Sequence, residues 1–113
     1  MKPAMILALS AAALGLAACA TEHPREPVAL ARVGKNVAGN ICVGCHDVSD
    51  DFRAPPPRLP GVPPAFITIA SDPKLELAHL TRFVRFPHGE MSNLPMTNND
   101  ADAVVAYILS LKR

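Results

Sequence analysis

The chain has 113 residues, half of them hydrophobic, and its eleven Lys and Arg and ten Asp and Glu residues leave a net charge of +1. This length suits one small domain, and the near-neutral charge excludes the strongly basic surface expected of a nucleic-acid-binding protein. Four Phe, one Tyr and no Trp supply little aromatic mass for a core that is already near the lower size limit.

The first nineteen residues are predicted to be a signal peptide. Lys2 supplies a positive charge, and residues 5–18 form an apolar run that is too short to span a membrane. The run ends in Leu16-Ala17-Ala18-Cys19, which resembles a bacterial lipobox, so Cys19 is the predicted lipid-bearing end of an anchored protein. The same residues also fit cleavage by ordinary signal peptidase, which would remove Cys19. Either alternative predicts export to the periplasm.

Residues 20–26 are expected to be a tether, and residues 27–113 one all-α domain of three to five helices with long loops between them. Pro27 suits the first turn of a helix. Gly34 and Ala38 are small residues that would let a second helix approach closely. They lie beside an apolar stripe at helical spacing, formed by Leu30, Val33, Val37 and Ile41.

This helix runs into the motif Cys42-Val43-Gly44-Cys45-His46. A Cys-x-x-Cys-His run is typical of the covalent attachment site of a c-type haem. Each thiol can form a thioether with one haem vinyl group, and the neighbouring imidazole can bind the iron. The motif therefore predicts one covalent haem c on Cys42 and Cys45, with His46 as an axial ligand.

Three other interpretations of the two cysteines fit less well. A redox-active Cys-x-x-Cys needs a βαβ context, and no strand pattern is present. A structural zinc site needs two more ligands at metal spacing, but His23, His79 and His88 are scattered along the chain. A disulfide between Cys42 and Cys45 is possible but would close a very short loop.

Residues 47–64 are predicted to be a loop, because their many prolines forbid a regular helix or a central strand. A proline-rich disordered linker is the alternative. The run is short and lies between two core segments, so we expect an ordered segment along one haem edge. Pro64 is expected to begin a short helical turn that carries Phe66, Ile67 and Ile69.

Two more helices are predicted towards the C-terminus. Asp72 and Pro73 form an N-cap and N1 pair for the first of them, which should end near Phe86 because Pro87 follows. Its apolar stripe is Leu77, Leu80, Thr81 and Val84. Thr97 and Asp100 form a variant of the capping box before the last helix. Its stripe is Ala101, Val104, Val105 and Ile108.

The loop before the last helix contains two methionines, Met91 and Met96, either of which could be the second axial ligand of the iron. With Thr97 as N-cap, Met96 occupies the position that packs on Ala101 in a hydrophobic staple. Met91 is surrounded by polar residues and has no such role. Met91 is therefore the predicted ligand, Met96 the alternative, and His88 or no sixth ligand a further possibility.

From Pro27 to the C-terminus, the chain resembles the small monohaem class I c-type cytochromes. The resemblance lies in Gly34, the Cys-x-x-Cys-His motif, the methionine loop and the helix with Ala106-Tyr107-Ile108. It implies that the first and last helices cross at Gly34 and Tyr107, and that Met91 takes the ligand position, with Ser92 where relatives usually carry proline. It also implies that a proline carbonyl accepts the His46 N–H, the candidates being Pro55, Pro56, Pro57, Pro63 and Pro64.

The resemblance implies an electron-transfer protein with His/Met ligation and transient redox partners, rather than an enzyme. No nucleic acid is expected as a partner, and the membrane would be reached through lipid on Cys19. Two alternatives stay open: the haem subunit of a periplasmic dehydrogenase or oxidase, and a gas-binding haem sensor with a labile sixth ligand.

Overall fold

The computed structural model describes residues 26–51, 53–86 and 89–113, and this part of the chain contains helices and no strand. The all-α prediction is confirmed. The predicted signal peptide with Cys19, nearly all of the tether and His88 lie outside the described residues. Within the described ranges, no helix is both long enough and apolar enough to cross a membrane. The elements are α1 (Glu26–Ile41), α2 (Phe66–Ala70), α3 (Leu77–Arg85), η1 (Gly89–Asn93, a 3-10 helix) and α4 (Asn98–Ser110).

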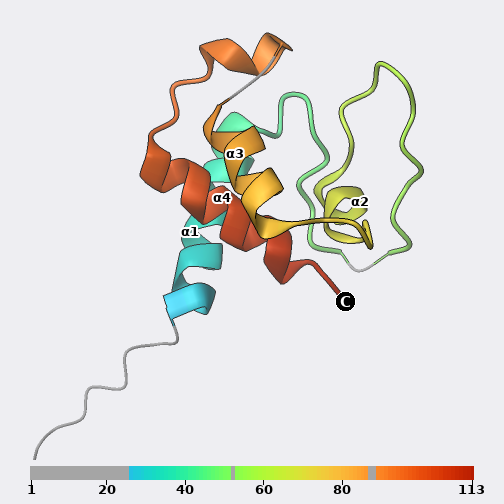
Figure 1. Ribbon diagram of the computed structural model, residues 1–113, viewed down its shortest axis with the longest axis horizontal. Helices are drawn as coiled ribbons and strands as arrows, with labels where there is room; N and C mark the ends of the chain where they lie inside the picture. Colours follow the sequence, from blue (N-terminus) through green and yellow to red (C-terminus); the bar gives the residue numbers. More distant parts are fainter. Residues whose placement is uncertain (1–25, 52, 87–88) are drawn as a thin grey trace, which may run out of the picture.

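Helix α4 is the element on which the other helices pack, and its closest partner is α1, which it crosses (Figure 1). Gly34 lies at this crossing. A Cβ atom at Gly34 would overlap the backbone carbonyl of Ala103 and lie 2.9 Å from Cβ of Tyr107. The predicted crossing at a small residue and an aromatic is therefore confirmed, because no side chain larger than hydrogen fits between the helices.

The apolar stripe predicted for α1 is only partly buried. Leu30 and Val33 are exposed, and Val37 and Ile41 are half-buried. The helix instead buries its small face, which consists of Ala31, Gly34 and Ala38 and continues into the buried Cys42 of the following turn. The prediction assumed that the face with the largest apolar side chains is buried. The close approach of α4 instead requires that the face with the smallest side chains is buried.

The core is one cluster that joins the inner faces of all four α-helices. Val104 and Ile108 of α4 are its largest fully buried side chains. They pack with a set of buried apolar residues from the other elements that includes Ala38, Phe66, Ala70, Leu80 and Val84. Burial of Leu80 and Val84 confirms half of the stripe predicted for α3, whereas Thr81 is half-buried and Leu77 is exposed.

Local sequence rules set the start of α4 correctly and the start of α3 wrongly. The Thr97 hydroxyl accepts the Asp100 N–H, while the Asp100 carboxylate accepts the Thr97 N–H, so the predicted capping box is present. Helix α3 begins at Leu77 rather than after Asp72. Asp72 accepts the N–H of Lys74 at 2.9 Å, which closes a turn and uses the carboxylate that was expected to cap the helix.

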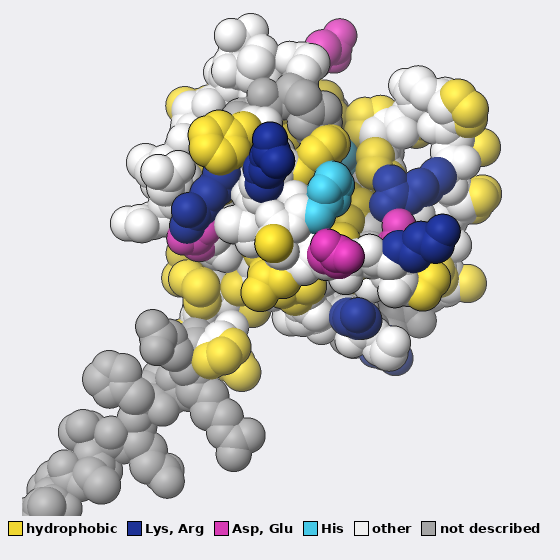
Figure 2. Space-filling view, in the orientation of Figure 1, with side chains coloured by type: hydrophobic (Ala, Val, Ile, Leu, Met, Phe, Trp, Pro, Cys, Tyr) yellow, Lys and Arg dark blue, Asp and Glu magenta, His cyan; other side chains and the backbone are white. Residues whose placement is uncertain are grey.

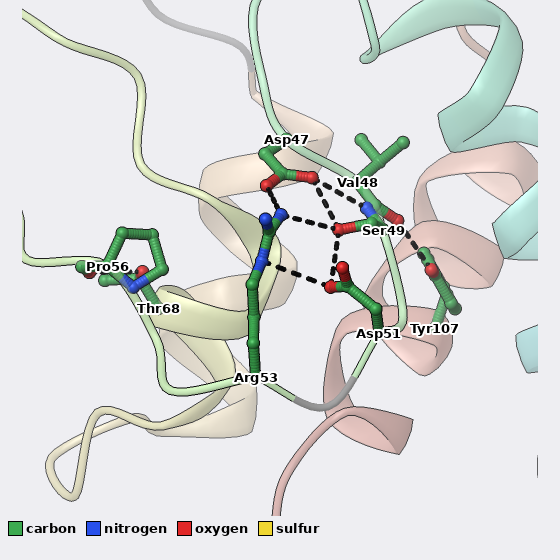
Figure 3. A network of polar contacts seen from close by, with 8 residues as sticks. All are labelled: Asp47, Val48, Ser49, Asp51, Arg53, Pro56, Thr68 and Tyr107. Carbon is green, nitrogen blue, oxygen red and sulfur yellow. Dashed lines mark hydrogen bonds and ion pairs between the residues drawn. The ribbon is translucent and has the colours of Figure 1, made fainter.

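The loop that follows Cys45 and His46 is tied to the core by two contacts, which Figure 3 displays. The Tyr107 hydroxyl donates a 2.6 Å hydrogen bond to the Val48 carbonyl. The Thr68 hydroxyl of α2 donates at 2.7 Å to the Pro56 carbonyl. The described residues 47–51 and 53–64 thus form the predicted loop, and contacts with α2 and α4 hold it in place.

We expect Gly34→Ala to lower the free energy of unfolding of the holoprotein by about 1–3 kcal/mol, since the added methyl group would force α1 away from the Ala103 carbonyl. Gly39→Ala is the matched control on the same helix, because no atom lies within 4 Å of the position a Cβ would take there. It should raise stability by up to about 1 kcal/mol through helix propensity. Equal stability of the two variants in urea titrations would contradict the close crossing.

Removal of the Tyr107 hydroxyl should also be measurable. Tyr107→Phe deletes the bond to the Val48 carbonyl and leaves the buried ring in place, so we expect a loss of about 1 kcal/mol in the free energy of unfolding. The haem absorption spectrum at neutral pH should not change, because the ring still fills the core. A variant as stable as the wild type would show that the hydroxyl does not hold the loop.

Candidate functional site

The helices and the two long loops line a cavity of about 920 Å³. This volume is at the upper end of the range of about 300–1,000 Å³ that is usual for cofactor sites. Its walls are mainly apolar, and they include Ile41, Phe66, Leu80, Val84, Val104 and Ile108. Every described helix contributes to the lining, so a group bound here would complete the hydrophobic core.

The predicted attachment motif lies at the wall of this cavity. Cys42 is buried, Cys45 is exposed, and both are free thiols that line the cavity. Helix α1 ends at Ile41, but the turn continues, since the His46 N–H donates at 2.9 Å to the Cys42 carbonyl. The two thiols are therefore presented one turn apart, as thioether formation with two vinyl groups requires.

The orientation of His46 follows from its hydrogen bond to the proline-rich loop. Its Nδ1 atom lies 2.7 Å from the carbonyl oxygen of Pro64. A carbonyl oxygen can only accept a hydrogen bond, so Nδ1 is the donor, and in the corresponding neutral tautomer the lone pair lies on Nε2. Metal-binding histidines commonly donate their other N–H to a carbonyl in this way. Among the five candidate prolines, the structure selects Pro64.

Aromatic and polar contacts fix the surroundings of His46. Its ring lies against Phe66 with a centroid distance of 5.4 Å, and Phe66 in turn contacts Tyr107 at 6.2 Å. The N–H of Phe66 donates to the carbonyl of Asp47 at 2.9 Å, which joins the residue after His46 to the start of α2. The Pro64 carbonyl thus orients the imidazole ring of His46, and the bond between Asp47 and the buried Phe66 fixes the backbone that follows it.

The carboxylate of Asp47 begins a polar network on the outer side of this loop (Figure 3). Asp47 accepts hydrogen bonds from the N–H and hydroxyl of Ser49 and pairs with Arg53, which also pairs with Asp51 at 3.2 Å. The hydrogen bonds from Ser49, with the charge of Arg53, lower the pKa of Asp47. The network links Asp47, Ser49, Asp51 and Arg53 through exposed hydrogen bonds and ion pairs.

Both candidate methionines line the cavity, but they do so from different surroundings. Met91 is the half-buried residue of η1, whose other four residues are exposed. Met96 is half-buried and packs against the core cluster that contains Ala101, as expected for the residue before the Thr97 cap.

Charged residues at the edge of the cavity were not predicted from the sequence. Arg58, Asp72 and Lys74 all contribute to its lining, and the Arg58 guanidinium lies 3.6 Å from the Asp72 carboxylate. Haem carries two carboxylates, so basic groups beside an apolar cavity suit it. On the face that Figure 2 displays, Lys and Arg side chains lie on both sides of a histidine with acidic side chains among them, so this face has mixed charge.

The described residues contain no group of three or more His, Cys, Asp and Glu side chains placed to hold a metal ion. The site instead offers two thiols, an imidazole with a free Nε2 and thioether side chains around an apolar cavity, and these residues fit a haem rather than a zinc ion. The charged edge could not be found from the sequence because Arg58 and Lys74 lie in loops without periodicity.

Comparison with known proteins agrees with this site. The family model described as Cytochrome c matches residues 31–112. A cytochrome c-552 of Bradyrhizobium diazoefficiens is 28% identical over 79 residues, which cover 70% of this chain and 72% of that protein. No solved structure matches. Since the matched residues run from the second turn of α1 through α4 and include the whole cavity, the chain belongs to the cytochrome c family as a small class I c-type cytochrome, an electron-transfer protein with covalently bound haem c.

Proposed function

We propose that this protein is an exported, periplasmic electron carrier whose single haem is attached through Cys42 and Cys45, with His46 and Met91 as its axial ligands. Bound haem supplies a one-electron couple between Fe(II) and Fe(III). The observation that carries the proposal is the 2.7 Å contact between Nδ1 of His46 and the Pro64 carbonyl, which leaves Nε2 available in a cavity that Cys42, Cys45 and Met91 also line.

The protein residues perform three tasks in this proposal. Cys42 and Cys45 hold the group permanently, so it cannot be lost to competing binding sites outside the cytoplasm. The hydrogen bond from His46 to Pro64 orients the imidazole and makes it a stronger ligand. Met91, a neutral and soft ligand, favours the reduced state and raises the reduction potential. With both axial positions filled, no position is left for a substrate, which suits a carrier better than an enzyme.

The assignment of Met91 over Met96 rests on their different packing. Met96 has a place in the core next to the Thr97 cap, and removal of its side chain from the core would cost apolar burial. Met91 points inward from a helix whose other residues are exposed, so its half-buried side chain is available to the iron. The tight turn of η1, closed by the 2.8 Å bond from the Ser92 hydroxyl to the Gly89 carbonyl, presents Met91 without help from a proline at position 92.

Partners are proposed to be redox proteins that bind transiently through small interfaces. A position near the membrane, through lipid on Cys19, would keep the carrier close to them. A permanent association with a larger dehydrogenase or oxidase subunit would appear as co-purification in a fixed ratio.

Met91→Ala should lower the reduction potential and open the iron, because the soft ligand is lost. We expect the reduced variant to bind carbon monoxide fully and rapidly, with a large spectral shift, whereas the wild type should change little. Met96→Leu is the control, since leucine keeps the apolar packing, and its spectrum should stay close to that of the wild type. An unchanged potential in Met91→Ala, or a high-spin spectrum in Met96→Leu, would move the ligand away from Met91. A wild type that binds carbon monoxide rapidly would favour a gas sensor.

The lipid anchor has its own test. We expect the mature protein to begin at Cys19 with a mass increased by its acyl chains, and to partition with membranes. Cys19→Ala should abolish this partitioning without a change in the haem spectrum or reduction potential. A wild-type protein that lacks Cys19 and is recovered entirely in the soluble periplasmic fraction would contradict anchoring and favour ordinary signal peptidase.

A further inference from the structure

An ion pair joins the last turn of α3 to the first turns of α4. The guanidinium of Arg85 meets the carboxylate of Asp102 through two contacts, Nε to Oδ1 at 2.8 Å and Nη2 to Oδ2 at 2.6 Å. This two-point geometry is the most specific form of the Arg–carboxylate interaction. Each group holds the other in its charged state: the hydrogen bonds and charge of Asp102 raise the pKa of Arg85, and those of Arg85 lower the pKa of Asp102.

The two residues of this pair lie on either side of the methionine segment in the chain. Arg85 and Asp102 lie 17 residues apart and flank the segment that carries η1, Met91 and Met96. Figure 1 shows this segment, in orange, extending beyond α3 before it returns to the start of α4. The pair therefore closes the base of the methionine loop.

Within residues 89–96, the polar contacts found between described residues are internal. They are the bonds from the Ser92 hydroxyl to Gly89, from the Leu94 N–H to Met91, and from the Met96 N–H to Leu94. The segment has no fully buried residue; Met96 packs against the core cluster, and Met91 is half-buried at the cavity. Apart from the packing of Met96, its placement over the cavity thus depends on how its two ends are held.

At the α4 end, the reciprocal hydrogen bonds of Thr97 and Asp100 fix the chain direction. At the α3 end, the described polar tie to α4 is the Arg85–Asp102 pair. We propose that the Arg85–Asp102 pair positions the methionine loop and thereby controls how often Met91 leaves the iron. This inference rests on the proposed axial role of Met91 and adds a residue pair that does not touch the haem site, since neither Arg85 nor Asp102 lines the cavity.

The physical reason is a competition between closed and open loop states. An external ligand can bind the iron only when Met91 has left it, so its apparent affinity is scaled by the fraction of open molecules. A contact that favours the closed state lowers that fraction. Loss of a partly exposed, two-point ion pair should therefore raise the open fraction modestly rather than abolish haem binding.

The test is titration of the oxidised holoprotein with imidazole, followed by the absorption spectrum. Arg85→Gln and Asp102→Asn should each tighten imidazole binding about two- to fivefold. Because the two groups act as one pair, the double variant should bind imidazole about as tightly as either single variant. High salt should tighten binding to the wild type by screening the pair and should have little effect on Arg85→Gln.

Arg82→Gln is the matched control. Arg82 carries the same charge in the same last turn of α3, and it is exposed, but it takes no part in the pair with Asp102. Its replacement should leave imidazole affinity unchanged. In a Met91→Ala background there is no ligand to displace, so Arg85→Gln should no longer alter imidazole affinity, whereas a general loosening of the fold would still do so.

The outcomes test the axial role of Met91 and the positioning role of the Arg85–Asp102 pair separately. If Met91→Ala binds imidazole no more tightly than the wild type, Met91 is not the ligand and both proposals fail. If Met91→Ala binds it more tightly but Arg85→Gln behaves like Arg82→Gln, the axial assignment stands and the positioning role is overturned. Tighter binding in Arg85→Gln and Asp102→Asn that disappears without Met91 supports the positioning role.

Discussion

The close crossing of α1 and α4 determines the position of almost everything else in this protein. It requires hydrogen as the side chain at position 34, because the backbone of Ala103 occupies the space of a Cβ atom. The crossing fixes the end of α1, and therefore the turn with Cys42 and His46, relative to the cavity wall formed by Val104 and Ile108. A rigid contact between two helices thus places a reactive motif that is itself mostly outside regular structure.

The rest of the site comes from loops, and prolines explain how loops can be so well placed. Residues 53–64 contain six prolines, which cannot donate backbone hydrogen bonds and therefore need fewer partners in an extended conformation. Their carbonyl oxygens remain free to accept. The structure uses two of them: Pro56 accepts from Thr68, which ties the loop to α2, and Pro64 accepts from His46, which orients the imidazole. The loop composition is thus directly connected with the chemistry of the site.

Short-range rules predicted those features whose causes lie within a few residues. The Cys-x-x-Cys-His turn, the Thr97–Asp100 capping box and the inward place of Met96 all depend on neighbours in sequence. The exposure of Leu30 and Val33 was not predicted because the buried face of α1 is determined by its packing against α4, about seventy residues away in the chain. Asp72 was misassigned because a turn competed for its carboxylate. The choice of Pro64 and the Arg85–Asp102 pair depend on tertiary geometry that no local pattern encodes.

The self-contained bonding of residues 89–96 has a consequence for protein engineering. A segment whose polar contacts among the described residues are internal, and whose ends are defined by α3 and α4, can be exchanged for another of equal length that keeps an apolar residue at the position of Met96, which packs against the core. Segments with a different turn, polarity or axial side chain could then be installed on one unchanged scaffold. Under the proposed ligation by Met91, the fold would separate the motif that attaches the haem from the segment that sets its potential, and the second could vary while the first is kept.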